Sequence, residues 1–428
     1  MIEENRVNEK LNKSFKKLLF NFFFLSVGQG LTFILPLLLT PFLINLIGVS
    51  KYAVVMVCQS VMTYFSIFTD YGFNLSATQQ CSVNRNDKNK LSIIVSEVFS
   101  TKLFLLLTGF FILSLVAFII PYFEEYRTIL LLSYGLVIAK VIFPTWFFQG
   151  VEEMKKMSFF IVFAKLILLF LFFLFYKMDG VFIYINIIFA AGDIIVGIIS
   201  LFYIRYFFLK KHIYLISYHN ILKILKNDYL LFLTNFTNNI YINSNIIILS
   251  IFVSTELVGF FAVAEKIMVA GKNIAAVVLQ ATYPRACKIA IESSSKFKIF
   301  LKSEFYFFIF LFFLVGVFTY SLSTSIVFFL IGHKNDVVSN YVKYLSFVPL
   351  IVSLNMPAYK VLIIYNLKYA YSTTVIIGAI INIILNFILI PIYKVEGTII
   401  TIIITEVFIT LSFHLILHFR FAQYKFLN

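Results

Sequence analysis

The chain has 428 residues, enough for two or three soluble domains, but its composition excludes a soluble protein. Hydrophobic residues make up 61% of it and charged residues 13%, whereas soluble domains have about 45–50% and about 25%. So few charged side chains cannot cover a globule in water. The net charge of +15 does not indicate a nucleic-acid-binding protein, because the basic residues lie in short segments between apolar runs. The composition predicts an all-α polytopic membrane protein.

Twelve membrane-spanning helices are predicted along the chain. Several apolar runs, such as those between Lys17 and Lys51 and between Glu304 and Lys334, lack any charge and exceed the roughly 20 residues that cross a bilayer core. The predicted spans, in chain order, are 18–45, 52–70, 97–120, 128–148, 158–176, 180–204, 229–252, 257–283, 303–331, 343–366, 370–391 and 396–419.

The basic residues indicate how these spans are oriented. If the N-terminus is cytoplasmic, more than four times as many lysines and arginines fall in inside segments as in outside loops. The five outside residues are Lys51, Arg127, Lys177, Lys334 and Lys394. Because cytoplasmic loops are enriched in basic residues, this bias predicts that both termini are cytoplasmic.

The longest inside loop, at about 205–228, divides the twelve spans into six and six. Residues 1–212 are therefore predicted to form an N-lobe and residues 213–428 a C-lobe. Charged residues recur in corresponding spans of the two halves: Lys140 corresponds to Lys360, and Asp193 to Glu406. An internal repeat of this kind is typical of transporters that work by alternating access.

Four spans carry stripes of polar side chains, the first of them with Asn21, Gln29 and Thr32. Gln59, Thr63, Ser66 and Asp70 share one face of the span 52–70, because they are spaced at helical intervals. The two spans after the central loop contain Asn235, Asn239 and Asn243, and then Glu265, Lys266, Lys272, Asn273 and Gln280. Interhelical hydrogen bonds, worth about 0.6 kcal/mol each, explain single asparagines. The charged groups instead favour a water-filled cavity, since charge within a membrane is costly.

The charges predicted at membrane depth are mainly basic. Lys140, Lys266, Lys272 and Lys360 indicate an anionic cargo, and lysine binds phosphate as a point charge. Lys165 is expected to snorkel to the membrane interface instead.

Sequence motifs of several enzyme classes are absent. The chain lacks a GxxxxGK[ST] loop, an HExxH or GxSxG motif and a Cys/His cluster, so neither direct use of ATP nor a metal or cofactor is expected. The three cysteines, Cys58, Cys81 and Cys287, show no metal-ligand spacing. A membrane glycosyltransferase would be expected to have a large outside loop, and every predicted outside loop is short. The chain is therefore predicted to be a transporter and not an enzyme.

Three segments carry a resemblance to a known family. Residues 70–78 (DYGFNLSAT) end the second span, and residues 144–150 (PTWFFQG) end the fourth. Residues 258–266 (VGFFAVAEK) open the eighth span, which ends in Tyr283-Pro284. In sequence and position these segments resemble the motifs of Wzx-type O-antigen flippases, polysaccharide transporters of the multidrug/oligosaccharidyl-lipid/polysaccharide superfamily.

The resemblance implies an inverted V of two six-helix lobes around a cationic cavity. It implies that the cargo is an undecaprenyl-diphosphate-linked O-antigen repeat unit, flipped from the cytoplasmic to the periplasmic leaflet of a bacterial inner membrane. O-antigen polymerase and a chain-length regulator are implied as further partners. This chain departs from the family in one respect: its basic residues at mid-membrane are all lysines, so no cavity arginine can be assigned.

Residue roles follow from this hypothesis. The diphosphate is expected to bind Lys140, Lys266, Lys272 and Lys360, and the sugars to contact Gln59, Asn235, Asn239, Asn243, Asn273 and Gln280. Asp70, Glu265 and Asp193 are the candidates for ion coupling, with Asp70 preferred because its stripe holds no lysine. The alternatives are a multidrug cation antiporter, a capsule or exopolysaccharide translocase, and, less favoured, a membrane glycosyltransferase.

Overall fold

A computed structural model describes residues 2–209, 213–365 and 367–420, and this part of the chain is helical, without strands. The side chains of residues 2–27 and of some later positions, Gln280 among them, lie outside the description. The prediction of an all-α protein is confirmed.

The chain forms two compact units. Unit 1 comprises Met1–Leu35 and Val61–Asn235, and unit 2 comprises Pro36–Ser60 and Phe236–Asn428. The chain passes between the units at three points, each within a long helix: twice in α1 (Ile2–Asp70) and once in α9 (Tyr218–Phe252). The proposed lobe boundary at 212/213 stays a prediction.

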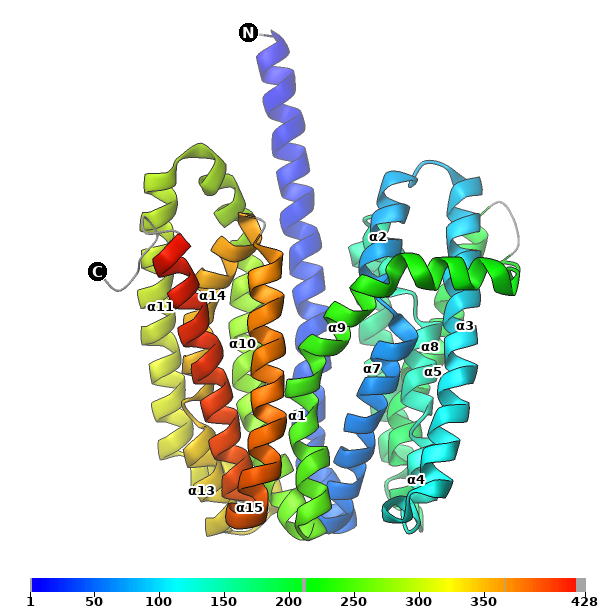
Figure 1. The fold of residues 1–428 in the computed structure, drawn as a ribbon. Coiled ribbons are helices and arrows are strands. Elements are labelled where there is room, and N and C mark those ends of the chain that lie inside the picture. Colours follow the sequence, from blue (N-terminus) through cyan, green and yellow to red (C-terminus); the bar gives the residue numbers. More distant parts are fainter. Residues whose placement is uncertain (1, 210–212, 366, 421–428) are drawn as a thin grey trace. The chain divides into compact units, whose positions relative to one another are not determined.

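Unit 1 contains two stretches of α1, the start of α9 and the helices between them (Figure 1). These are α2 (Phe73–Val83), α3 (Lys88–Ile119), the 3-10 turn η1 (Pro121–Phe123), α4 (Arg127–Leu132), α5 (Gly135–Ile142), α6 (Thr145–Gly150), α7 (Met154–Phe175), η2 (Val181–Tyr184) and α8 (Ile185–Phe207). The first part of α9 crosses α2 and α3 instead of running alongside them (Figure 1).

Unit 2 contains the middle of α1, the rest of α9 and all later helices. These are α10 (Thr255–Glu292), α11 (Ser294–Ser321), α12 (Ser323–Ile331), α13 (Asp336–Leu345), α14 (Val348–Ile364) and α15 (Lys368–Arg420). Two of the long helices are interrupted: Gly48 breaks α1 at φ 77°, and Lys394 breaks α15 at φ 52°. Both residues lie between predicted spans, so these breaks mark predicted turns.

Eight helices of the described chain are long and apolar enough to cross a membrane. The first, Gly30–Val83, and the last, Tyr369–Phe419, contain the breaks at Gly48 and Lys394. Helices α9 and α10 are not among the eight, because polar and charged residues lower their hydropathy. Within them, only the shorter segment Asn243–Phe252 is counted as apolar. The chain is a multi-pass membrane protein. Twelve spans and cytoplasmic termini stay predictions.

Some helices differ from their predicted bounds for local reasons. The predicted span 128–148 is divided into α4, α5 and α6, with the last break before Pro144, where proline disfavours helical conformation in the preceding residue. Helix α3 begins nine residues before the predicted start because Asp87 caps it, accepting hydrogen bonds from the amides of Asn89 and Lys90.

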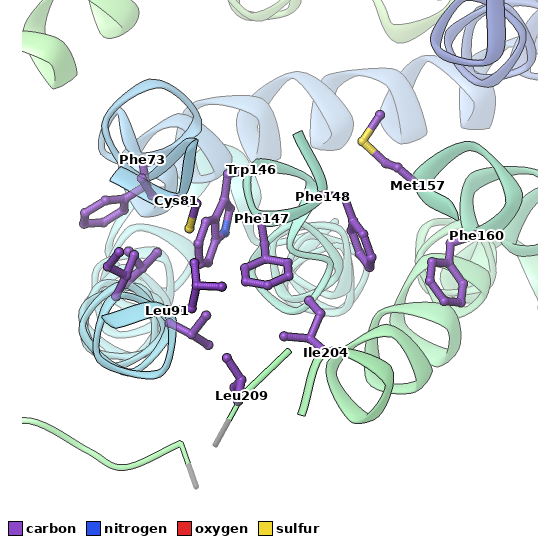
Figure 2. Packing of buried hydrophobic residues seen from close by; sticks show 14 of the residues in the cluster. Phe73, Cys81, Leu91, Trp146, Phe147, Phe148, Met157, Phe160, Ile204 and Leu209 are labelled. Carbon is purple, nitrogen blue, oxygen red and sulfur yellow. The ribbon is translucent and has the colours of Figure 1, made fainter. Parts of the chain in front are cut away.

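Two of the motif segments pack against each other in unit 1. The Thr78 hydroxyl on α2 donates to the Trp146 carbonyl on α6 (3.1 Å), and the Thr145 hydroxyl donates to Asn74 Oδ1 (3.3 Å). Phe73, Phe147 and further apolar side chains from α2, α3, α6, α7 and α8 fill the core around this contact (Figure 2). The two motifs therefore have a packing role: they join the end of the second span to the end of the fourth.

Gly150 permits the close approach of α6 to α2. A Cβ at this position would lie 2.5 Å from Cys81 Cβ and 2.8 Å from the Thr78 carbonyl oxygen. We expect Gly150→Ala to destabilise the protein by about 1–3 kcal/mol, because a backbone atom cannot move aside without separating the helices. Thermal unfolding in detergent measures this. The matched control is Gly30→Ala, where nothing lies within 4 Å of the added Cβ. Equal melting temperatures for both variants would contradict the packing role.

Candidate functional site

Two ion pairs connect helices of unit 1 at predicted membrane depth. Lys102 Nζ on α3 lies 2.9 Å from Asp70 Oδ1 on α1, and Lys165 Nζ on α7 lies 2.9 Å from Asp193 Oδ2 on α8. The prediction that Lys165 snorkels is wrong, since its ammonium binds Asp193 within the helix bundle. The argument that favoured Asp70 as ion carrier also loses its basis, because a lysine from a neighbouring helix neutralises it.

Lys140 on α5 differs from these paired lysines. It interacts electrostatically with Asp70, Lys102, Lys165 and Asp193, which lie on four other helices of unit 1. Yet its side chain is exposed, and no hydrogen bond or ion pair joins it to any residue that the structure describes. The two ion pairs are each neutral, so the five-residue cluster has a net positive charge that belongs to Lys140.

In unit 2, Lys272 on α10 binds Glu406 on α15. The two charged atoms, Nζ and Oε1, are 2.6 Å apart, and Glu406 is buried. Glu265, on the same helix as Lys272, interacts electrostatically with it but forms no ion pair within the described part of the chain. The Lys272 ammonium therefore interacts with two carboxylates and is paired with one of them. The pair with Glu406 neutralises its charge, which disfavours an anion at Lys272 while the pair is intact.

Lys360 on α14 is fully buried, and its ammonium donates three hydrogen bonds. Its ammonium donates to both Glu304 oxygens on α11 (2.6 and 2.7 Å) and to the Thr282 hydroxyl on α10 (2.6 Å). A group neutralised in this way and closed to solvent has no donor left for a phosphate. The assignment of Lys360 to the diphosphate-binding set is therefore corrected: it is an interior structural pair that joins three helices.

Lys266 is the remaining predicted cation in unit 2. Its ammonium donates to the Tyr52 hydroxyl at 3.2 Å and lies 5.5 Å from the centre of that ring. The side chain is half-buried. A phenol oxygen does not neutralise the charge, so Lys266 keeps its positive charge, although Glu265 precedes it in the chain.

The predicted sugar-contacting amides lie in both units. Asn235 ends the second segment of unit 1, and Gln59, Asn239, Asn243 and Asn273 belong to unit 2. All five side chains are half-buried, and Asn243 donates to the Asn239 carbonyl one turn away on α9 (3.2 Å). The Gln280 side chain lies outside the described residues.

Sequence reasoning missed Lys102 and Glu304. Each lies near the start of a predicted span, where a charge is easily taken for a residue at the membrane boundary. One signal could have found them: a buried charge needs a partner of opposite sign. Asp70, at the end of the predicted span 52–70, and Lys360, within the predicted span 343–366, had no assigned partner of opposite charge. Among the described residues, no three His, Cys, Asp or Glu side chains lie close enough together to hold a metal ion.

Solved structures define the class of fold. An inward-facing multidrug resistance MATE family transporter of the MOP superfamily matches with a TM-score of 0.69 at 13% identity, over 94% of this chain and 96% of that one. The lipid II flippase MurJ, in an inward closed conformation, matches with a TM-score of 0.70 at 16% identity, over 92% and 87%. This chain therefore has the fold that these membrane transporters share.

The family follows from the sequence comparison. Residues 18–290 match the family described as Polysaccharide biosynthesis protein, and the chain belongs to that family. A protein of Escherichia coli (strain K12) named "Putative O-antigen transporter" is 26% identical over 394 residues, which cover 91% of this chain and 94% of that protein. A protein of the same name from Shigella dysenteriae is 27% identical over 406 residues, covering 91% and 98%.

These relatives confirm the predicted resemblance to O-antigen flippases. They are named transporters, so the prediction of a transporter and not an enzyme is also confirmed. The protein is a membrane transporter of the polysaccharide biosynthesis family.

Proposed function

We propose that the protein flips undecaprenyl-diphosphate-linked O-antigen repeat units from the cytoplasmic to the periplasmic leaflet of the bacterial inner membrane by alternating access. The observation that carries the proposal is Lys140, an exposed ammonium at predicted membrane depth that pairs with none of the described residues. Such a charge is costly in a membrane unless it serves a pathway, and it suits the diphosphate of the lipid carrier. The family and the named relatives support an O-antigen cargo.

In unit 1, Lys140 is the proposed contact for the diphosphate. In unit 2, Lys266 is a further candidate, and Lys272 becomes a candidate only when it leaves Glu406. Amides such as Asn239 and Asn273 are proposed to meet the sugars, and O-antigen polymerase and a chain-length regulator are proposed partners. A multidrug cation antiporter would need a negatively charged site instead. The positive cluster of unit 1 therefore favours the polysaccharide cargo.

Deletion of the gene tests the proposal. We expect the surface polysaccharide to lose its O-antigen and lipid-linked repeat units to accumulate in the cytoplasmic leaflet, with restoration by the plasmid-borne gene. Loss of capsule or exopolysaccharide with normal O-antigen would support the alternative translocase. Unchanged polysaccharides together with greater sensitivity to cationic drugs would contradict the proposal and favour the antiporter.

Membrane sidedness is a separate prediction. Reporter fusions after residues 90, 156 and 215 should report the cytoplasm, and fusions after residues 125 and 335 the periplasm, because the basic loops are expected inside. Alkaline phosphatase and fluorescent-protein fusions measure this directly. A periplasmic signal at 215 would contradict the six-plus-six topology.

Ion coupling is proposed to use Glu265 rather than Asp70 or Asp193. Asp70 and Asp193 each hold a lysine at 2.9 Å, whereas Glu265 forms no ion pair with a described residue. We expect Glu265→Gln to abolish ion flux driven by substrate in proteoliposomes without changing the melting temperature. Asp70→Asn should instead lower the melting temperature, since it leaves Lys102 buried without a counter-charge. Full coupled flux in Glu265→Gln would exclude Glu265 as the carrier.

A further inference from the structure

A polar cavity lies where the first part of α9 crosses α2 and α3. Its volume is about 260 Å³, and its polar lining consists of Gln80, Glu97, Asn220, Lys223, Asn227 and Asp228. The α9 residues fall at helical spacing on one face, and Gln80 and Glu97 come from α2 and α3. All of them belong to unit 1, and Figure 1 shows α9 lying across the other two helices.

The side chains of this cavity are available to a ligand. Asp228 accepts one hydrogen bond, from the Ser76 hydroxyl at 2.9 Å. The side chains of the other five lining residues form no hydrogen bond or ion pair within the described part of the chain. Glu97 is half-buried and forms no ion pair with a described residue, although Lys223 lines the same cavity.

The walls of the cavity are held in place independently of any ligand. The segment before α9 is bonded to α3: the amides of Tyr214 and Ile216 donate to the hydroxyls of Ser96 and Ser100, both at 3.2 Å. Beyond the cavity, the Tyr71 and Phe232 rings stack at 4.6 Å.

Gly72, at φ 89°, lets α9 lie against the start of α2. A Cβ on Gly72 would lie 2.7 Å from Leu231 Cβ, so only glycine fits there. A cavity fixed on both sides binds a ligand with little ordering cost.

The chemistry of the lining fits a polyhydroxyl ligand. Carboxylates only accept hydrogen bonds, the ammonium only donates, and the three amides do both, which matches sugar hydroxyls. Two carboxylates disfavour a diphosphate, and the ammonium of Lys223 disfavours a metal cation. The volume lies just below the usual range of roughly 300–1,000 Å³ for drug-sized ligands, so the cavity suits one or two sugar rings and not a whole repeat unit.

We propose that this cavity is a carbohydrate subsite that holds a sugar of the lipid-linked oligosaccharide before translocation. The inference rests on the proposed function, which makes the oligosaccharide the cargo and the α2–α3 turn cytoplasmic. The subsite is distinct from the lysines proposed for the diphosphate. It adds recognition of the glycan at the face where the substrate arrives.

The test uses the purified full-length protein in nanodiscs. The probe is the free repeat-unit oligosaccharide, released from its lipid carrier by mild acid and lacking phosphate, and binding is measured by saturation-transfer NMR and titration. We expect the double variant Glu97→Gln/Asn227→Ala to weaken oligosaccharide binding at least tenfold. In cells it should slow O-antigen export, with restoration when substrate synthesis is increased. The control is Asn89→Ala, an exposed amide on α3 that does not line the cavity.

The outcomes separate this inference from the proposed function. Unchanged oligosaccharide binding in the double variant would overturn the subsite, whereas normal O-antigen in the deletion strain would overturn the proposed function. Competition by millimolar Ca²⁺ or Mg²⁺ for the same NMR signals, lost in the double variant, would identify a cation site and would also overturn the sugar assignment. A melting temperature equal to that of the wild type shows that the double variant is folded. If it is not, Asn220→Ala, at an exposed position of the same lining, gives the same test.

Discussion

Replacing Lys360 by methionine should destabilise the protein by roughly 3–5 kcal/mol. Glu304 would then keep its negative charge at a site where its side chain is 9% exposed, and the Thr282 hydroxyl would lose its donor. The cost comes mainly from the uncompensated charge and not from the lost attraction, because a buried pair recovers little more than its own desolvation.

A double-variant experiment separates the cost of the uncompensated charge from that of the lost attraction. Lys360→Met/Glu304→Leu removes both charges, so its melting temperature in detergent should recover most of the loss seen for Lys360→Met. The matched control is Lys288→Met, which removes the lysine of an exposed pair with Glu292 at 3.8 Å and should have no measurable effect. If the double variant is as unstable as Lys360→Met, the charge imbalance is not the cause.

Replacing Lys140 by alanine should abolish O-antigen export while the protein level stays normal. The side chain is exposed and forms no hydrogen bond or ion pair with the described residues, so its removal breaks none of these there. It would, however, remove the one charge of the unit 1 cluster that no carboxylate balances. Lys140→Arg should keep much of the activity, because it preserves the charge. Complementation of the deletion strain, read as the O-antigen ladder on a gel, measures both.

Two controls make this result specific to Lys140. Lys177→Ala removes an exposed lysine from a loop of the same unit and should leave export unchanged. Lys165→Ala leaves Asp193 without its partner and should lower the protein level as well as export. Export at wild-type level in Lys140→Ala would show that this charge does not serve the substrate.

The helical class and the family could be predicted from the sequence because both depend on local information. Apolar runs longer than about 20 residues can hardly form anything but buried or membrane-spanning helices. The segments 70–78 and 144–150 carried the family resemblance by residue type alone. Their packing role was not predicted, because the approach of Gly150 to Cys81 joins residues far apart in the chain.

Assignments of single residues to the site were less predictable. A stripe on one helix shows which residues share a face but not which neighbouring helix lies against it. Asp70 has no lysine on its own polar stripe, but it forms an ion pair with Lys102 on α3. From its position in the predicted span, the Lys165 side chain could also have extended to the membrane interface. Only the packing of α7 on α8 places Asp193 beside its ammonium.

The sequence by itself determined that this protein is a multi-pass helical membrane transporter with cationic groups in its predicted spans, because hydropathy and residue type are properties of the chain. The tertiary structure alone decided which of those groups keep their charge available. Lys360 forms an ion pair with Glu304 and Lys272 forms one with Glu406, whereas Lys140 forms none with the described residues. The physical reason is that the effect of a buried charge depends on its nearest opposite charge, and in a helical bundle that charge usually lies on another helix.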